Sequence, residues 1–469
     1  MSTAAQRFLH DAAIKSADLM HREIIRRGME SYDAAHLKGR SRIRDWDAAR
    51  RRCQEIKYEA IKHLDKYLLQ FEEQVIARGG HVFWAENSQQ ACDYIRNLAT
   101  SKGVRTVVKS KSMVTEEIQL APALESAGIK VWETDLGEYI VQLRNEPPYH
   151  IVTPAMHLTR GQIAELFREK LGEDIADHDP VKLVALARRT LREAFFSAEM
   201  GISGANFLVA DSGVIAISTN EGNGRLCTSV PRIHVAVTGI EKVIPRLEDL
   251  AVLWPVLATS GTGQGITTYG TLVGGPRQPG ETDGPEEFHV VLVDNGRSSL
   301  LADPEQREVL NCIRCGACLN ICPVFRNVGG HTYGTTYPGP IGSVLTPHLR
   351  GKEFQHLSYA SSLCGACTSV CPVNINLHHH LLENRRNTVS AGSTKWTERM
   401  AFKLWRWSML RPAVYSAGGW LGRTTLRLFY GLGLAGSAVD PLRSWTRGRS
   451  PVPLPSQSFR ALWRKDRAR

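Results

Sequence analysis

Apolar residues recur at helical spacing through the first part of the chain. The clearest case is one long amphipathic stretch over residues 46–77, in which Ile56 and Ala60 fall on the same face. Glycines follow at positions 79 and 80, as glycine commonly follows the last turn of a helix. The pattern therefore predicts an N-terminal helical region over residues 1–75.

Beyond these glycines, short apolar runs alternate with amphipathic helical stretches. Strands are predicted at His81–Ala85, Val104–Lys109, Lys130–Glu133 and His150–Pro154. Helices are predicted at residues 88–99, 115–127 and 160–171. Strands that alternate with helices in this way are typical of a mostly parallel sheet in an α/β fold.

Between residues 200 and 300 the predicted strands lie closer together, and glycine-rich turns separate several of them. These strands are Ala205–Ala210, Val214–Thr219, Ile233–Thr238 and His289–Asp294. Closely spaced strands of this kind are typical of hairpins. We therefore expect an α/β domain over residues 76–304 that is completed by hairpins.

The last third of the chain divides into two parts. Residues 305–385 are helical in pattern and carry most of the cysteines. Residues 386–469 are interrupted by repeated proline and glycine and show no strong periodicity after about residue 430. The chain is thus expected to end in a C-terminal extension that follows a helical, cysteine-bearing domain.

Charge is distributed unevenly along the chain, which carries 58 Lys and Arg against 47 Asp and Glu, a net +11. Residues 395–469 hold 15 basic and 3 acidic residues, which is +12, so the other 394 residues are close to neutral at −1. Proteins that bind nucleic acid with their folded body carry the positive charge there. We therefore expect no nucleic-acid partner and a basic extension on a neutral body.

The N-terminus contains no apolar stretch of signal-peptide length and carries Asp11 and Asp18. The sequence also has no window of about 18 apolar residues, which predicts that no helix spans a membrane. We therefore expect a cytoplasmic protein. In that compartment we expect the ten cysteines to be metal or redox ligands in preference to disulfides.

Seven of the ten cysteines form two runs, each followed by proline. The first run is Cys312-x2-Cys315-x2-Cys318-x3-Cys322, the ligand run of bacterial ferredoxins. The second run is Cys364-x2-Cys367-x3-Cys371. Two intervening residues let neighbouring thiolates reach different irons of one cluster, whereas a structural zinc site uses four ligands, usually as two pairs. The spacing predicts a ferredoxin-type domain with two iron–sulfur clusters, and the isolated cysteines are expected to be ordinary buried residues: Cys53, Cys92 and Cys227.

In two-cluster ferredoxins the fourth cysteine of one run binds the cluster of the other run. This rule assigns the first cluster to Cys312, Cys315, Cys318 and Cys371. It leaves the second cluster with three cysteines: Cys322, Cys364 and Cys367. Ser361 stands where a complete second run would carry its first cysteine. Three outcomes are open: a [4Fe–4S] cluster with a serine, water or other non-cysteine ligand, which we favour, a [3Fe–4S] cluster, or a labile cluster.

Two polar clusters of the α/β region are candidates for substrate binding. The first, at the end of a predicted strand, is Lys109, Ser110, Lys111 and Ser112. Backbone amides and cations at such a position favour an anion such as a carboxylate or phosphate. The second is a polar, glycine-containing turn that includes Asn220 and Glu221. The alternative for both is a well-formed turn without a function.

Long, non-repetitive strings accompany these motifs. They include KSKSMVTEEI at 109–118, ETDLGEYIVQL at 133–143, GISGANFLVADSG at 201–213 and WTERMAFKLWRW at 396–407. With these strings, the chain resembles the lactate utilisation protein B family over about residues 40–430. The resemblance implies a LUD domain, related in fold to CoA-transferases and ribose-phosphate isomerases, and two [4Fe–4S] clusters. It also implies a role in the oxidation of L-lactate to pyruvate, with a cysteine-rich-repeat protein and a second LUD protein as partners.

Two functions from different classes fit these observations. The first is an electron-transfer subunit that passes electrons through two clusters to a membrane or partner acceptor. The second is an enzyme that acts on an acyl or sugar-phosphate substrate in the LUD domain, with clusters that are structural or sensing. The sequence identifies no catalytic residue for lactate.

Six of the ten tryptophans lie in the basic extension, over residues 395–469. Tryptophan and arginine together fit an anionic membrane face, a partner subunit or nucleic acid. The alternative is a helix that packs on the chain's own body and keeps its basic face in water. We expect peripheral contact with the inner face of the membrane, or with a partner subunit, through this extension.

Overall fold

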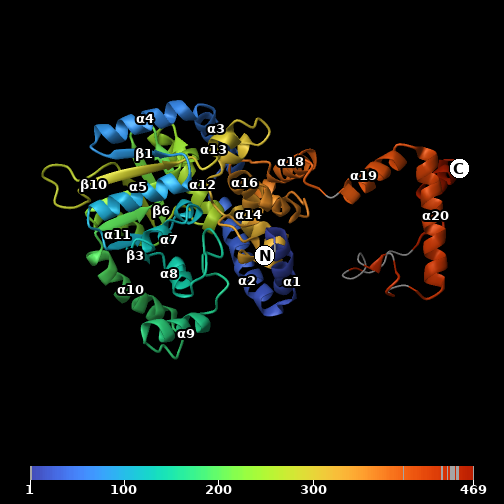
Figure 1. Cartoon of the computed structure of the whole chain (residues 1–469), viewed down its shortest axis with the longest axis horizontal. Helices are drawn as coiled ribbons and strands as arrows, with labels where there is room; N and C mark the ends of the chain where they lie inside the picture. Colours follow the sequence, from blue (N-terminus) through green and yellow to red (C-terminus); the bar gives the residue numbers. More distant parts are fainter. Residues whose placement is uncertain are drawn as a thin grey trace. The chain divides into compact units, whose positions relative to one another are not determined.

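The structure is a computed structural model that describes residues 3–394, 396–434, 437–440, 442–443, 449 and 454–467. It consists of two units, Met1–Asn387 and Thr388–Arg469 (Figure 1). The first unit contains the N-terminal helices, the α/β region and both cysteine runs. The three regions that the sequence distinguishes there therefore pack as one body, and each unit is described by itself.

Four helices open the chain: α1 (Ala4–Ala17), α2 (Leu19–Arg40), α3 (Trp46–Lys62) and α4 (Leu64–Ala77). The single helix predicted over residues 46–77 is wrong, because the backbone leaves the helical region at His63, with φ −121° and ψ 44°. Both halves still bury the predicted apolar face, with Ile56 and Ala60 on α3 and Phe71 on α4. A local break at one residue leaves the amphipathic pattern intact, so the sequence pattern does not reveal it.

A six-stranded, all-parallel sheet forms the centre of the α/β region, in the order β1-β10-β7-β4-β2-β3. Its strands are β1 (His81–Ala85), β2 (Thr106–Lys109), β3 (Lys130–Glu133), β4 (Met200–Ser203), β7 (Ile233–Gly239) and β10 (Glu287–Val293). The parallel α/β layer predicted from the sequence is thereby confirmed. Strand β4 was not predicted, because its four residues are all buried and show no alternation of apolar and polar positions.

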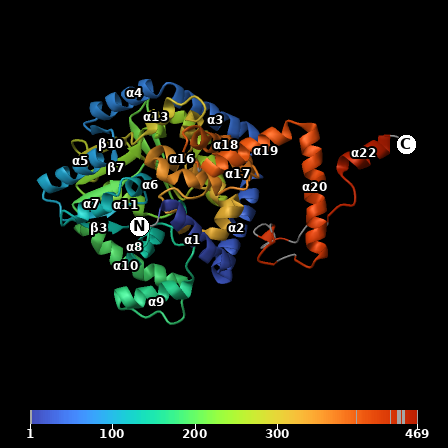
Figure 2. The same cartoon turned by 45° about the vertical axis from the view of Figure 1, so that its right-hand side comes forward.

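Helices cover the sheet on both faces. The helices α5 (Ser88–Ser101) and α7 (Leu120–Glu125) share one apolar core with the strands, whereas α9 (Arg160–Leu171) and α10 (Pro180–Ser197) belong to another. In both cartoons α9 and α10 lie on the opposite side of the α/β region from α4 (Figures 1 and 2). The helix predicted over residues 115–127 is two short helices, because Gln119 adopts a left-handed backbone with φ 57°.

A second, four-stranded sheet has the order β8-β5-β6-β9. Its strands are β5 (Phe207–Val209), β6 (Val214–Thr219), β8 (Val243–Ile244) and β9 (Tyr269–Val273). β5 and β6 form the expected antiparallel hairpin. The strand predicted at His150–Pro154 is wrong, because the His150 Nδ1 accepts the N–H groups of Val152 and Thr153 and so closes a tight turn.

The cysteine-bearing region is helical, as predicted. Its helices are α14 (Ala317–Ile321), α15 (Pro323–Val328), α16 (Gly339–Arg350), α17 (Ala366–Val370) and α18 (Leu377–Ser390). α14 contacts both α16 and α17, and the N-terminal helix α2 contacts α14 and α15 (Figures 1 and 2). The Arg50 guanidinium of α3 also donates to the Cys371 carbonyl at 2.8 and 3.0 Å. The N-terminal helices thus hold the cysteine region within the first unit.

The second unit contains α19 (Trp396–Met409), α20 (Pro412–Gly431) and α22 (Phe459–Arg467). Arg460 of α22 donates to Ser416 Oγ at 2.9 Å and lies over the Tyr415 ring, so α22 packs on α20. No residue of these three helices is buried. Among the residues that the structure describes, no helix has the length and apolar character needed to cross a bilayer.

Candidate functional site

The two cysteine runs fold in the same way. The backbone is left-handed at Arg314, which precedes Cys315, and at Leu363, which precedes Cys364, with φ 59° and 55°. Gly316 and Gly365 follow two residues later with φ 82° and 78°, and each begins a five-residue helix, α14 or α17. The structure therefore contains a backbone repeat that the cysteine spacing alone indicates only in part.

This repeat places Ser361 as the counterpart of Cys312. The Arg314 N–H donates to the Cys312 Sγ at 3.4 Å, and the Leu363 N–H donates to the Ser361 Oγ at 3.1 Å. The serine oxygen thus has the same backbone donor as the cysteine sulfur. Ser361 therefore occupies the place in the second run that Cys312 occupies in the first.

The thiols occur in surroundings that fit iron–sulfur ligands. All ten cysteines are free thiols, and in the two runs only Cys364 is exposed. The Ile375 N–H donates to the Cys371 Sγ at 3.3 Å, as the Arg314 N–H does to Cys312. Buried thiols with backbone donors suit thiolates that bind a cation, and amide hydrogen bonds to sulfur are among the features that set cluster potentials. The residues present therefore fit two clusters.

Charge interactions among the thiols cross between the two runs. Burial raises the pKa of the Cys371 thiol to about 12, and the charge of Cys312 in the first run is the next cause. Burial raises the pKa of Cys367 to about 11, with the charge of Cys322 as the next cause. Each run's last cysteine is thus close enough to interact with cysteines of the other run.

A small cavity borders the three cysteines that are predicted to bind the second cluster. It is lined by twelve residues, among them Cys322, Ser361, Cys364, Cys367 and His378. His378, at the start of α18, has its Nδ1 at 2.8 Å from the Thr368 Oγ1. The wall of this cavity therefore offers three non-cysteine side chains that can ligate iron: Ser361, Ser362 and His378.

A much larger cavity, of about 830 Å³, lies in the first unit. It is lined by residues of α2, of the α/β region and of the first cysteine run, including Cys315. Four of the six predicted substrate-binding residues line it: Lys111, Ser112, Asn220 and Glu221. This cavity brings the predicted polar clusters together beside a cysteine ligand position.

The other two predicted residues, Lys109 and Ser110, do not line this cavity. Lys109 is fully buried and forms ion pairs with Glu133 at 2.9 Å, Glu116 at 3.2 Å and Glu138 at 3.6 Å. These three carboxylates raise the pKa of Lys109 against the opposing effect of burial. Lys109 therefore neutralises a buried acidic cluster, while Ser110 is buried and extends the sheet by donating its N–H to Ile202 O.

Lys111 and Glu221 belong to one polar group on the cavity wall. The Lys111 Nζ donates to Asp135 Oδ2 and to the Val152 carbonyl, both at 3.0 Å. The Leu136 N–H donates to Glu221 Oε2 at 3.2 Å. Burial, with the nearby charge of Asp135, raises the pKa of Glu221 to about 7. A carboxyl group with this pKa can accept or donate a proton near neutral pH.

Two cationic residues of the cavity wall were missed by sequence reasoning: Lys242 and Arg314. Lys242 ends the short turn Ile240–Lys242 that follows β7, and Arg314 lies within the first cysteine run. Lys242 is buried, and Arg314 is half-buried with 9% of its side chain exposed. Arg314 lies within a cysteine motif that indicates metal binding and not anion binding, and Lys242 belongs to no motif.

A buried ionic network connects this wall to the α/β region. The Arg297 guanidinium donates to both oxygens of Glu117, at 2.8 and 2.9 Å, and to Glu241 Oε2 at 2.6 Å. The Tyr337 hydroxyl donates to Glu117 at 2.7 Å, and Arg314 donates to Glu241 at 3.2 Å. The network therefore fixes the position of Arg314 relative to the parallel sheet.

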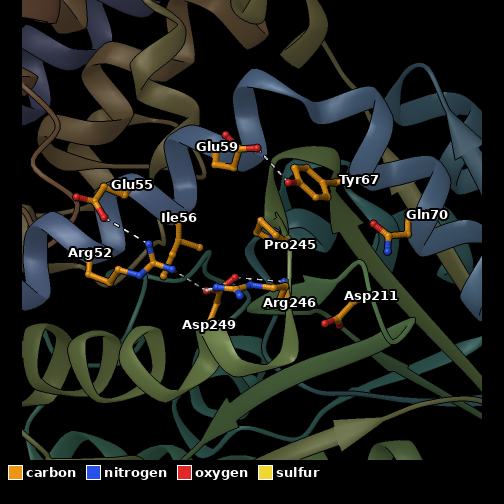
Figure 3. A pocket seen from close by; sticks show the side chains of 10 residues that line it. All are labelled: Arg52, Glu55, Ile56, Glu59, Tyr67, Gln70, Asp211, Pro245, Arg246 and Asp249. Atoms are coloured by element: carbon orange, nitrogen blue, oxygen red, sulfur yellow. Dashed lines mark hydrogen bonds and ion pairs between the residues drawn. The ribbon is translucent and has the colours of Figure 1, made fainter.

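A surface pocket between α3, α4 and the loop after β8 offers less for chemistry. Its charged side chains include Arg52, Glu55, Arg246 and Asp249 (Figure 3). Arg52 pairs with Glu55 at 3.4 Å and with Asp249 at 3.3 Å, and Arg246 also pairs with Asp249 (Figure 3). Because both arginines are already paired with carboxylates of the pocket itself, we place no site there.

The tryptophans of the C-terminal extension lie on its surface where the structure describes them. The exposed fraction is 72% for Trp396, 59% for Trp405 and 60% for Trp420. Trp445 lies outside the described residues. The three isolated cysteines are buried, as predicted: Cys53, Cys92 and Cys227.

Three family models match consecutive parts of the chain. The LUD domain matches residues 68–293, the 4Fe-4S dicluster domain matches residues 308–375, and the C-terminal region of lactate utilisation protein B matches residues 382–468. These matches confirm the predicted fold class, a LUD α/β domain followed by a ferredoxin-type domain and a C-terminal extension. Residues 1–67, 294–307 and 376–381 lie before or between these matches.

Curated relatives cover nearly the whole chain. Proteins named lactate utilization protein B from Bacillus thuringiensis (strain Al Hakam), Bacillus cereus (strain AH187) and Bacillus anthracis (strain CDC 684 / NRRL 3495) are each 46% identical over 432 residues. Each alignment covers 92% of this chain and 90% of the relative. A crystal structure of a duf162 family protein from Deinococcus radiodurans is 13% identical over 49% of this chain and 98% of its own, with a TM-score of 0.28 that is too low to support an argument.

Proposed function

The chain belongs to the lactate utilisation protein B family and is a lactate-utilisation iron–sulfur protein, and on this premise we propose that it transfers the electrons released when L-lactate is oxidised to pyruvate. The observation that carries the proposal is the pair of cysteine runs that share one backbone conformation and whose helices α14 and α17 contact each other. Two adjacent clusters form a path for single electrons. The acceptor is a membrane pool or a partner protein.

We assign the clusters according to the crossed rule. The first [4Fe–4S] cluster is held by Cys312, Cys315, Cys318 and Cys371. The second is held by Cys322, Cys364 and Cys367, with Ser361 as the fourth ligand. The shared backbone of the two runs and the equivalent N–H donors to Cys312 and Ser361 support the serine. The clusters supply one-electron storage, and this chain's residues hold them, exclude water and hydrogen-bond their sulfur ligands.

The fourth ligand is tested by replacing Ser361. We expect Ser361→Ala to lose about one iron per chain and to convert the second cluster to a [3Fe–4S] signal, because one iron then lacks its protein ligand. Ser361→Cys, which completes the run, should retain the native iron content. Iron and sulfide analysis with electron paramagnetic resonance (EPR) measures both effects. Native spectra for Ser361→Ala, together with altered spectra for His378→Ala, would assign the ligand to the histidine instead.

The electron-transfer role is tested by reduction. L-Lactate added without oxygen to the holoprotein and its two proposed partners, a cysteine-rich-repeat protein and a second LUD protein, should bleach the visible absorbance of the clusters. Because the substrate is the source of the electrons, omission of lactate should leave the absorbance unchanged. Absorbance that stays unchanged with lactate and both partners contradicts the proposal.

A second candidate function is supported by the large cavity. An enzyme that acts on an acyl or sugar-phosphate substrate would use the predicted residues on its wall: Lys111, Ser112, Asn220 and Glu221. In that case the clusters are structural or sensing. The reduction experiment separates the two functions, because clusters of this kind need not accept electrons from lactate.

We propose that the protein acts at the inner face of the membrane, through the extension over residues 395–469. The net charge of +12 and the exposed tryptophans support this contact. The full chain should float with anionic liposomes and the chain without residues 395–469 should not. Flotation should weaken severalfold in Trp405→Ala and remain native in Trp84→Ala, a matched exposed tryptophan of β1. Equal flotation of the full and shortened chains would favour a partner subunit over the membrane.

A further inference from the structure

We propose that the large cavity binds a small organic carboxylate through Lys242 and Arg314, directly beside the first cysteine run. Both residues line the cavity together with Cys315. The anion site rests on the geometry described below. Its assignment to a 2-hydroxy or 2-keto monocarboxylate rests on the proposed function.

Lys242 is a buried cation without a counterion. Only 6% of the residue is exposed, and among the residues that the structure describes its ammonium group has no hydrogen bond or ion pair. The adjacent Glu241 cannot serve it as a dedicated counterion, because both oxygens of that carboxylate are taken, one by Arg297 and the other by Arg314. Burial lowers the pKa of Lys242 to about 8, and an anion inside the cavity would stabilise the charged ammonium group.

Arg314 offers a second, partly unused donor group. Its Nη2 donates to Glu241 at 3.2 Å, whereas its Nη1 is buried and has no hydrogen-bond partner. The guanidinium carbon lies 4.6 Å from the centre of the Tyr337 ring, so that ring supports one face of the group. A fixed guanidinium with a free N–H edge suits a carboxylate, which accepts hydrogen bonds in the same plane.

The charge balance of the cavity supports one small anion rather than a cation. Lys111 is already paired with Asp135 at 3.0 Å, and Glu241 is shared by two arginines. Glu221 is the remaining carboxyl on the wall, and burial raises its pKa to about 7, so it is partly neutral. The network of Arg297, Arg314, Glu117 and Glu241 carries no net charge, so Lys242 is the cation of the wall that is in excess until an anion binds.

The same wall can serve the rest of a hydroxy acid. Glu221 lines the cavity as a polar residue and Ile151, Val152 and Leu257 as apolar ones, whereas the Asn220 amide is already bonded to Gln264 and Thr268. The wall therefore contains cationic, protic and apolar side chains, the three kinds of partner that a short hydroxy or keto carboxylate uses. A phosphate ester would pair with the cations but would leave the apolar residues of the wall without a contact.

The experiment measures binding to the full-length holoprotein by calorimetry, with pyruvate, L-lactate and inorganic phosphate as separate probes. The native chain should bind pyruvate or lactate, and Lys242→Met should weaken this binding by at least about tenfold, because truncating one partner of a buried charge pair is costly. Lys62→Met, an exposed lysine of α3, is the matched control and should bind as the native chain does. Arg314→Lys keeps the charge but not the fork and should also bind more weakly.

A second readout does not depend on turnover. Since Cys315 lines the cavity, pyruvate should shift the EPR spectrum of the first cluster in the native chain and not in Lys242→Met. Equal pyruvate affinity of the native chain and Lys242→Met overturns the site, and so does binding of phosphate alone. If the native chain binds neither carboxylate but lactate still reduces the clusters with the partners present, this site fails and the electron-transfer role stands. If the native chain binds a carboxylate but lactate does not reduce the clusters, the carboxylate site stands and the electron-transfer role fails.

Discussion

Replacing Cys371 by serine is expected to remove the cluster of the first cysteine run, although Cys371 belongs to the second. Its thiol is buried, and after burial the charge of Cys312 is the largest influence on its pKa. The crossed arrangement makes it the fourth ligand of the first cluster. We expect the iron content to fall by about half, the EPR signal of the first cluster to disappear and lactate-dependent reduction to be lost.

The reciprocal substitution, Cys322→Ser, should remove the second cluster while leaving the first. Cys53→Ser, a buried cysteine outside both runs, serves as the matched control and should keep the full iron content. Loss of the second cluster in Cys371→Ser would show that each run binds its own cluster. That result would refute the crossed assignment and leave the number of clusters unchanged.

Replacing Arg297 by methionine should destabilise the protein by about 3–5 kcal/mol, the usual cost when one partner of a buried ion pair is removed. Arg297 is 1% exposed, and its side chain makes four hydrogen bonds: two to Glu117, one to Glu241 and one to the Asp294 carbonyl. Its removal leaves two buried carboxylates with too few donors. Because Glu241 also holds Arg314, the variant should weaken carboxylate binding in the large cavity as well.

The destabilisation by Arg297→Met should depend on pH, because it arises from the buried carboxylates Glu117 and Glu241. Arg297 and Arg314 overcome the effect of burial and lower the pKa of Glu241 from 4.5 to about 2. A depressed pKa contributes stability above the unfolded value, and the native chain loses that contribution as the pH falls from about 4.5 toward 2. In Arg297→Met the buried carboxylates become easier to protonate, so the deficit should shrink as the pH is lowered.

Thermal unfolding of both holoproteins between pH 8 and pH 4 measures this difference. Arg26→Met is the control, because Arg26 pairs with Glu23 and Glu30 on the exposed surface of α2 and its loss should matter little. A constant difference between Arg297→Met and the native chain across this pH range would show that the carboxylates are not the source of the defect.

Much of the fold could be predicted because it depends on local patterns. The alternation of strands and helices indicated a parallel sheet, and burial on both faces explains why β4 escaped the same reasoning. The breaks at His63 and Gln119 were also missed. Each break involves one residue whose backbone leaves the helical region, and the apolar spacing on either side is unaffected.

By itself the sequence determined the chemistry of the cysteine centres, since the reach of neighbouring thiolates toward one cluster depends on two or three intervening residues. It also located the positive charge in the C-terminal extension. Only the tertiary structure decided what the lysines do: Lys109 neutralises buried glutamates, while Lys111, two positions later, lines the cavity. Likewise, only folding places Lys242 and Arg314 on the wall of one cavity, because 71 intervening residues separate them and no local spacing encodes this arrangement. Packing of the α/β region against the cysteine region forms that wall, and with it the proposed site.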